Sequence, residues 1–191
     1  MATRKSDYPI LDLILTRRSM RAMSGEPLTQ KELNQLFEAA RWAPSAYNNQ
    51  PWRFVYAHRG TSDWDVFFNL LVEFNQQWAK NAGALVVIAS RTTFQKTGKL
   101  SRTHAFDTGS AWENLALQGH AMGLVVHAME GFDYKKARVQ LEVPQEYEIH
   151  CMVAIGKPAP KETLSDELQE KEVSTNRKPV SDFTFEGKFV D

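Results

Sequence analysis

The alternation of apolar and polar positions along the chain predicts helices interleaved with strands. One predicted helix follows the capping box Thr29–Glu32, in which Thr29 bonds forward and Glu32 reaches back. Its inner face carries apolar residues at helical spacing, namely Leu33, Leu36, Phe37 and Ala40. The helix must end before Pro44, because a proline disfavours helical backbone in the residue before it. The polar segment that follows therefore begins at a helix C-terminus.

Shorter patterns predict the other elements. Apolar runs predict strands at residues 53–57, 85–89, 124–127 and 150–155, and helical patterns cover residues 10–17, 64–80 and 107–121. The small residues of the last helix favour packing against another helix, in this chain or in a second subunit. Residues 91–104 are polar and basic, which predicts an exposed, mobile excursion. Strands interleaved with helices indicate an α/β or α+β domain, and the strand order cannot be read from the pattern.

The chain has 191 residues, the length of one domain. After Pro160 the sequence becomes charged and poor in aliphatic residues, with late aromatic residues at Phe183, Phe185 and Phe189. Such a segment cannot form a core alone. We therefore divide the chain into a domain over residues 1–160 and a C-terminal extension over residues 161–191. The extension is either a disordered tail or a segment that packs on another surface.

Charge and cysteine content exclude several classes of protein and of site. Lys plus Arg and Asp plus Glu both number 23, so the formal net charge is zero and the basic excess of a nucleic-acid binder is missing. The single cysteine, Cys151, excludes an intramolecular disulfide and a cysteine-based metal cluster, and it favours a reducing cytoplasm. The N-terminus lacks the apolar core of a secretory signal, and the longest apolar stretch, 84–89, is too short to span a membrane.

Two polar segments carry candidate chemistry. Residues 17–21, RRSMR, place three guanidinium groups and a hydroxyl within five residues, and arginine pairs with phosphate oxygens through paired hydrogen bonds. Residues 43–52, APSAYNNQPW, are rich in amides and hydroxyls that can hydrogen-bond a polar heterocycle. The glycine motifs of Rossmann and P-loop nucleotide sites, metal-ligand signatures and a G-x-S-x-G nucleophile motif are all missing. Together these segments predict a site for a phosphorylated ring compound.

These two segments and residues 123–133, GLVVHAMEGFD, resemble the flavin-dependent nitroreductase family. The ordered match runs from about Leu11 to Lys157. The resemblance implies an α+β fold with a mostly antiparallel central sheet flanked by helices. It also implies an FMN cofactor, NADH or NADPH as electron donor, and a homodimer in which the C-terminal extension wraps the partner subunit. The three late phenylalanines would then be its anchors.

The resemblance assigns four residues to the phosphate end and the N1–O2 edge of the flavin. Arg17 and Ser19 match residues at the phosphate and ribityl chain. Arg21 matches a basic residue near flavin N1 and O2, where positive charge would stabilise the reduced flavin. Arg177 aligns loosely with a C-terminal basic residue that often joins the phosphate clamp, with Thr175 where a second basic residue is usual.

The resemblance also assigns residues around the ring. A flavin-contacting loop that the other subunit usually supplies is matched by Pro44, Ser45 and Asn48. The backbone amides of Glu130 and Gly131 match a segment that faces flavin N5 and O4, although an ordinary turn after a strand would also explain them. Asn75 either contacts the pyrimidine edge or faces solvent, and Trp78 stands where the family often has a lysine.

The implied enzyme passes a hydride by way of flavin N5 to a nitroaromatic, quinone or related electron-poor acceptor in a ping-pong cycle, without a catalytic residue of its own. The same scaffold resembles branches that dehalogenate aromatic rings, reduce enals or semialdehydes, oxidise azolines or fragment reduced flavin. A flavin carrier without turnover is a further alternative. Residues 91–104 are the region in which we expect substrate-lid differences among the branches.

Overall fold

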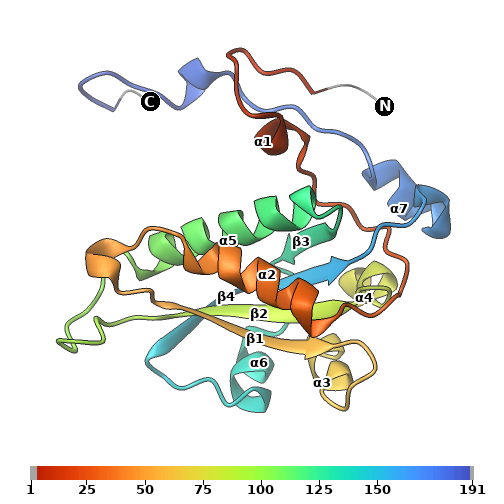
Figure 1. Ribbon diagram of the computed structural model, residues 1–191, viewed down its shortest axis with the longest axis horizontal. Helices are drawn as coiled ribbons and strands as arrows, with labels where there is room; N and C mark the ends of the chain where they lie inside the picture. The colour runs from red at the N-terminus through yellow and green to blue at the C-terminus, as the bar shows by residue number, and fades with distance from the viewer. Residues whose placement is uncertain (1–3, 190–191) are drawn as a thin grey trace.

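A four-stranded antiparallel sheet forms the centre of the computed structural model, which describes residues 4–189 (Figure 1). The strands pair in the order β1-β2-β4-β3 and comprise β1 (Trp52–His58), β2 (Ala84–Arg91), β3 (Val125–Met129) and β4 (Tyr147–Gly156). Each corresponds to one predicted strand. Together with the helices around the sheet, they confirm the predicted α+β fold with its antiparallel sheet.

The central strand β2 separates two hydrophobic clusters. Successive side chains of a strand point to opposite faces of a sheet. Leu85, Val87 and Ala89 accordingly belong to one cluster, and the alternate residues Ala84, Val86 and Ile88 belong to the other. This strand is buried on both faces, which explains why its sequence is a continuous apolar run and not an alternating one.

Helices cover both faces of the sheet. One face packs against α2 (Gln30–Arg41) and α5 (His104–Ala121), and the other against α3 (Trp64–Phe68), α4 (Glu73–Ala79) and α6 (Tyr134–Gln140). The prediction that the helix around 107–121 packs against another helix is confirmed, because its buried Ala111 and Leu115 share a cluster with Leu36 and Ala40 of α2.

The predicted boundaries hold where local signals are strong. Thr29 accepts from the Glu32 amide, and the Glu32 carboxylate accepts from the Thr29 amide over 2.7 Å, so the capping box is confirmed. The helical region predicted over residues 64–80 consists of two helices, α3 and α4, with a break between them that was not predicted. The amide of Val72 donates to the carbonyl of Gly131, and this bond holds the break against the loop after β3. Helix α6 was not predicted.

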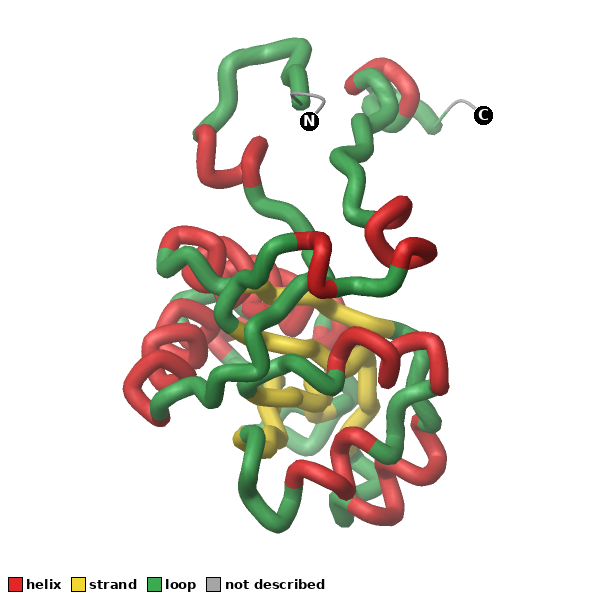
Figure 2. Tube along the Cα trace, turned by 90° about the vertical axis from the view of Figure 1, so that its right-hand side faces the viewer, coloured by secondary structure: helices red, strands yellow, loops and turns green. Residues whose placement is uncertain are grey.

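Two terminal segments project from the same side of the body (Figures 1 and 2). The first contains α1 (Asp12–Thr16), and the second contains η3 (Val180–Asp182) and follows η2 (Lys161–Thr163) and α7 (Asp166–Lys171). Both expose large apolar side chains, at Tyr8, Ile10, Leu11, Ile14, Val173, Phe183, Phe185 and Phe189. Leu164 and Leu168 are buried in the core, so the start of the extension packs on the domain. The domain boundary after residue 160 stays a prediction.

Candidate functional site

A cluster of arginines surrounds one cavity of about 230 Å³. Four residues predicted from the sequence line it, namely Arg17, Ser19, Arg21 and Arg177. Arg4, Arg18 and His127 line it as well. The C-terminal residue Arg177 thus lies at the same cavity as the RRSMR segment, from which about 155 residues separate it in sequence. A second cavity of about 340 Å³ adjoins this one and shares Arg4, Arg17 and Arg177.

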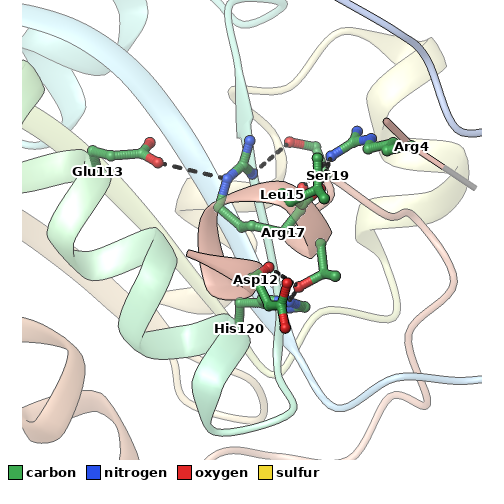
Figure 3. Close-up of polar contacts among 8 residues, drawn as sticks. Arg4, Asp12, Leu15, Arg17, Ser19, Glu113 and His120 are labelled. Carbon is green, nitrogen blue, oxygen red and sulfur yellow. Dashed lines mark hydrogen bonds and ion pairs between the residues drawn. The ribbon is translucent and has the colours of Figure 1, made fainter. Parts of the chain in front are cut away.

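The segment that carries these arginines is held on helix α5 (Figure 3). Arg17 lies with Nε 3.7 Å from the Glu113 carboxylate and donates from Nη1 to Ser19 Oγ over 3.4 Å. Just before it, Thr16 Oγ1 lies 2.8 Å from His120 Nε2. These contacts come from the side of α5 that faces the N-terminal segment, so α5 fixes where the guanidinium of Arg17 lies.

The cavity is electropositive. Burial, together with the positive charges of Arg177, Arg18 and Arg17, holds the pKa of Arg4 below its ordinary value. The Nε atoms of Arg4 and Arg21 are buried and have no hydrogen-bond partner within the described chain. Like charges gathered around buried, unpaired donors favour an anionic ligand rich in acceptor atoms. The donor set therefore fits a phosphate group.

An aromatic pair, Trp78 and His127, lies beside Arg21. The Arg21 guanidinium is 5.9 Å from the centroid of the fully buried Trp78 ring, and that ring contacts His127 with centroids 4.5 Å apart and the two planes tilted by 35°. His127 Nδ1 donates to the carbonyl of Met20 over 2.9 Å, and burial lowers the pKa of this histidine to about 4. The imidazole is therefore neutral at pH 7, and its hydrogen bond to Met20 and its contact with Trp78 hold it in place.

The predicted pair around the ring edge makes direct contact. Asn75 is buried on α4 and donates from Nδ2 to the carbonyl of Gly131 over 3.0 Å. The alternative of a solvent-facing Asn75 is therefore wrong. A Cβ added to Gly131 would lie 2.7 Å from Asn75 Nδ2, so this glycine permits the close approach of α4. Glu130 beside it is exposed.

None of the residues of the polar loop after α2 lines the arginine cavity, and the loop lies at the N-terminal end of α5 (Figure 1). It contains Pro44, Ser45 and Asn48, and the last of these belongs to η1 (Ala46–Asn48). Tyr47 and Asn48 both have a φ of 52°, a left-handed conformation that side chains disfavour. The Ala46 amide donates to Oδ2 of the buried Asp107 over 3.0 Å, which ties the loop to α5. One chain thus supplies two separate parts of the predicted site.

Sequence reasoning missed three residues of these two parts. Arg4 lies 13 residues before Arg17, outside the matched motif, and donates to the carbonyl of Arg17 over 2.6 Å. Asp107 has the position of an ordinary acidic residue in the first turn of α5. Glu172 lies in the weakly matched extension, yet it is buried and lines the arginine cavity. No local pattern marks any of them.

A separate polar cluster surrounds the buried Ser90. Ser90 Oγ lies 2.7 Å from His104 Nδ1 and 2.6 Å from His150 Nε2, but Ser90 is fully buried and cannot reach a substrate. Burial also lowers the pKa of His150 and raises the pKa of Cys151 to about 11.

Residues 4–189 hold no group of three or more metal-ligating side chains. Within that range, no helix is long and apolar enough to cross a membrane.

The fold and the arginine cavity define an antiparallel α+β protein with an electropositive cavity beside its N-terminal segment. A sequence model of the nitroreductase family matches residues 14–63 and 61–157, and the chain belongs to that family. The resemblance drawn from the sequence motifs is therefore confirmed.

Relatives and solved structures agree with this assignment. A structure described as an oxidoreductase containing FMN has a TM-score of 0.93 and 44% identity, covering 98% of this chain and 96% of its own. An NADH dehydrogenase of Thermus thermophilus is 26% identical over 191 residues, which cover 81% of this chain and 91% of the relative. Protein DrgA of Synechocystis is 29% identical over 174 residues, which cover 76% of this chain and 82% of the relative.

Proposed function

We propose that this protein reduces a nitroaromatic, quinone or related electron-poor acceptor in a ping-pong cycle. It is an oxidoreductase of the nitroreductase family, with FMN as cofactor and NADH or NADPH as electron donor. The observation that carries the proposal is the arginine cavity, in which residues from both ends of the chain surround a space suited to a phosphate. When bound, FMN supplies a ring nitrogen that accepts and returns a hydride.

The residues of this chain bind and tune the cofactor. Arg17 and Arg177 hold its phosphate, and Ser19 contributes a hydroxyl at the same cavity. Arg21 supplies positive charge that favours the reduced cofactor, because that form carries more negative charge on the ring. This guanidinium lies 5.9 Å from the centroid of the buried, uncharged Trp78 ring.

The ring end of the site has two further contributors. The Asn75–Gly131 contact sets the position of the segment whose backbone amides are assigned to the reactive edge. The loop with Pro44, Ser45 and Asn48 completes the site from a second copy of the chain, since within one chain it lies away from the arginine cavity.

A homodimer is part of this proposal. The two terminal segments expose large apolar side chains without a core of their own, including Leu11 and Phe189, which are 70% and 79% exposed. A monomer rarely leaves apolar side chains gathered in this way in water. Packing of these segments on a second copy would bury them and bring the 43–52 loop to the arginine cavity. A cytoplasmic location stays a prediction from the single cysteine.

Absorption spectroscopy of the purified protein tests the function. We expect a flavin spectrum that is bleached by anaerobic NADH or NADPH and restored by an added quinone. Arg21→Ala is expected to retain the fold and to weaken FMN binding or slow its reduction. A protein that cannot be reconstituted with FMN would contradict the proposal. A bound flavin that NADH and NADPH both leave oxidised would instead favour a carrier, or a branch supplied with reduced flavin.

A further inference from the structure

Glu172 joins the C-terminal extension to the arginine segment. Its carboxylate Oε1 accepts from the backbone amides of Arg21 and Ala22, the latter over 3.1 Å. Its own carbonyl accepts from Arg18 Nη2 over 3.1 Å, and the neighbouring carbonyl of Lys171 accepts from Arg21 Nη1 over 3.4 Å. Two residues of the extension therefore make four hydrogen bonds to residues 18–22.

The burial and partners of Glu172 set it apart from other acidic residues of the extension. Its side chain is 6% exposed and lines the arginine cavity. In the described chain the carboxylate binds main-chain amides and forms no ion pair with a guanidinium. A buried carboxylate that accepts two amide hydrogen bonds is strongly anchored, and its loss would leave both amides unpaired.

We infer that Glu172 is a positioning residue for the cofactor phosphate, an inference that rests on the proposed function. It fixes the backbone from which Arg18 and Arg21 extend. It also begins the segment that brings Arg177, five residues later, to the same cavity. The carboxylate acts through its acceptor geometry, because its negative charge by itself opposes a phosphate dianion. Glu172 thus couples the extension to the phosphate site through its hydrogen bonds to the backbone of residues 21 and 22.

Three variants separate geometry from charge. Glu172→Gln keeps an oxygen that can accept from both amides and removes the charge, whereas Glu172→Ala removes both. Glu170→Ala is the matched control, since Glu170 is an exposed acidic residue of α7, two positions before Glu172, and its loss changes the net charge equally. The readout is the binding of FMN and of riboflavin, which lacks the phosphate, to apoprotein by quenching of flavin fluorescence.

We expect Glu172→Ala to weaken FMN binding roughly tenfold or more, the equivalent of one or two buried hydrogen bonds, with little change for riboflavin. Glu172→Gln and Glu170→Ala should bind FMN as the unsubstituted protein does, or more tightly. Equal weakening by Glu172→Gln and Glu172→Ala would overturn the geometric role, and so would normal FMN binding by Glu172→Ala.

The design also covers loss of folding and failure of the proposed function. Circular dichroism and thermal unfolding of each apoprotein report folding. If Glu172→Ala does not fold, Glu172→Asp serves in its place, because its carboxylate is one methylene shorter and should weaken FMN binding selectively. Glu172→Asp with unchanged FMN binding would then overturn the inference. If the unsubstituted protein binds no FMN, the proposed function fails. If it prefers FMN to riboflavin and Glu172→Ala does so equally, only the inference fails.

Discussion

Asn75 Nδ2 donates to the carbonyl oxygen of Gly131 over 3.0 Å, and this bond joins helix α4 to the loop after β3. The two residues are 56 apart in sequence. The amide of Val72 donates to the same carbonyl over 3.1 Å. The approach is so close that an added Cβ at position 131 would lie 2.7 Å from Asn75 Nδ2 and 3.0 Å from Val72 Cγ2. Both predicted ring-edge residues are therefore parts of one packed contact.

Gly131→Ala is expected to lower the free energy of unfolding by about 1–3 kcal/mol, because the added methyl group must displace the Asn75 amide. In the background of Asn75→Ala the same substitution should be less destabilising, since the nearest atom is then missing. Urea unfolding of the four proteins of this double-mutant cycle measures the coupling. An equal effect of Gly131→Ala in both backgrounds would show that Asn75 does not restrict the position.

The stability of the protein should fall in mild acid because of His127. Its pKa is about 4 in the folded state against an ordinary value of 6.5, and burial is the main cause. Between these values the unfolded chain binds the proton and the folded chain does not. The stabilising contribution is therefore complete above pH 6.5 and is lost as the pH falls toward 4. The expected loss from about pH 7 to about pH 4.5 is on the order of 2 kcal/mol.

His127→Asn is the matched variant for this prediction, since its amide can still donate to the carbonyl of Met20 but does not titrate. Urea unfolding at several pH values should show a shallower pH dependence for the variant. Carboxylates titrate equally in both proteins, so the difference between the two curves isolates His127. Parallel curves would contradict the assigned pKa.

The thiol of Cys151 should be unreactive in the folded protein. Burial raises its pKa to about 11, and the thiolate is the reactive form. At neutral pH the thiolate is then roughly a hundredfold scarcer than for an exposed cysteine. Ellman's reagent should react slowly with native protein and rapidly in urea, to one thiol per chain. Fast reaction without denaturant would mean that the thiol is accessible and ionised.

Asp107 is expected to hold the polar loop in place. Its carboxylate accepts from the Ala46 amide over 3.0 Å and from Thr103 Oγ1 over 3.2 Å. Asp107→Ala should destabilise the protein by about 1–3 kcal/mol, because the Ala46 amide loses its acceptor. It should also speed chymotrypsin cleavage after Tyr47, which is 92% exposed.

Thr103→Val is the control for the loop, since it removes the other donor to Asp107 and leaves the Ala46 bond intact. Mass spectrometry of the first fragments identifies the cleavage site. If cleavage after Tyr47 is equally fast in Asp107→Ala and the unsubstituted protein, the left-handed backbone of the loop is held by other contacts.

Local spacing decided much of what could be predicted. The capping box Thr29–Glu32 and the helix after it depend on contacts between residues three and four apart, and the spacing of residues in the sequence indicates such contacts directly. The buried strand β2 is a continuous apolar run because it packs on both faces. The three guanidinium groups of RRSMR lie near one another because their residues are close neighbours in the sequence. The family followed from the order of such motifs.

Only the tertiary structure decided the rest, because the deciding partners are distant in sequence. The predicted helical region over 64–80 is divided where Val72 pairs with Gly131, and no local pattern marks that contact. Helix α6 is short and charged, and its burial depends on Ala137 against the sheet. Arg177 and Glu172 reach the arginine cavity because the extension returns across the domain. Local torsional preferences and side-chain spacing specify elements, whereas burial and hydrogen bonds across the sheet specify which elements share a site.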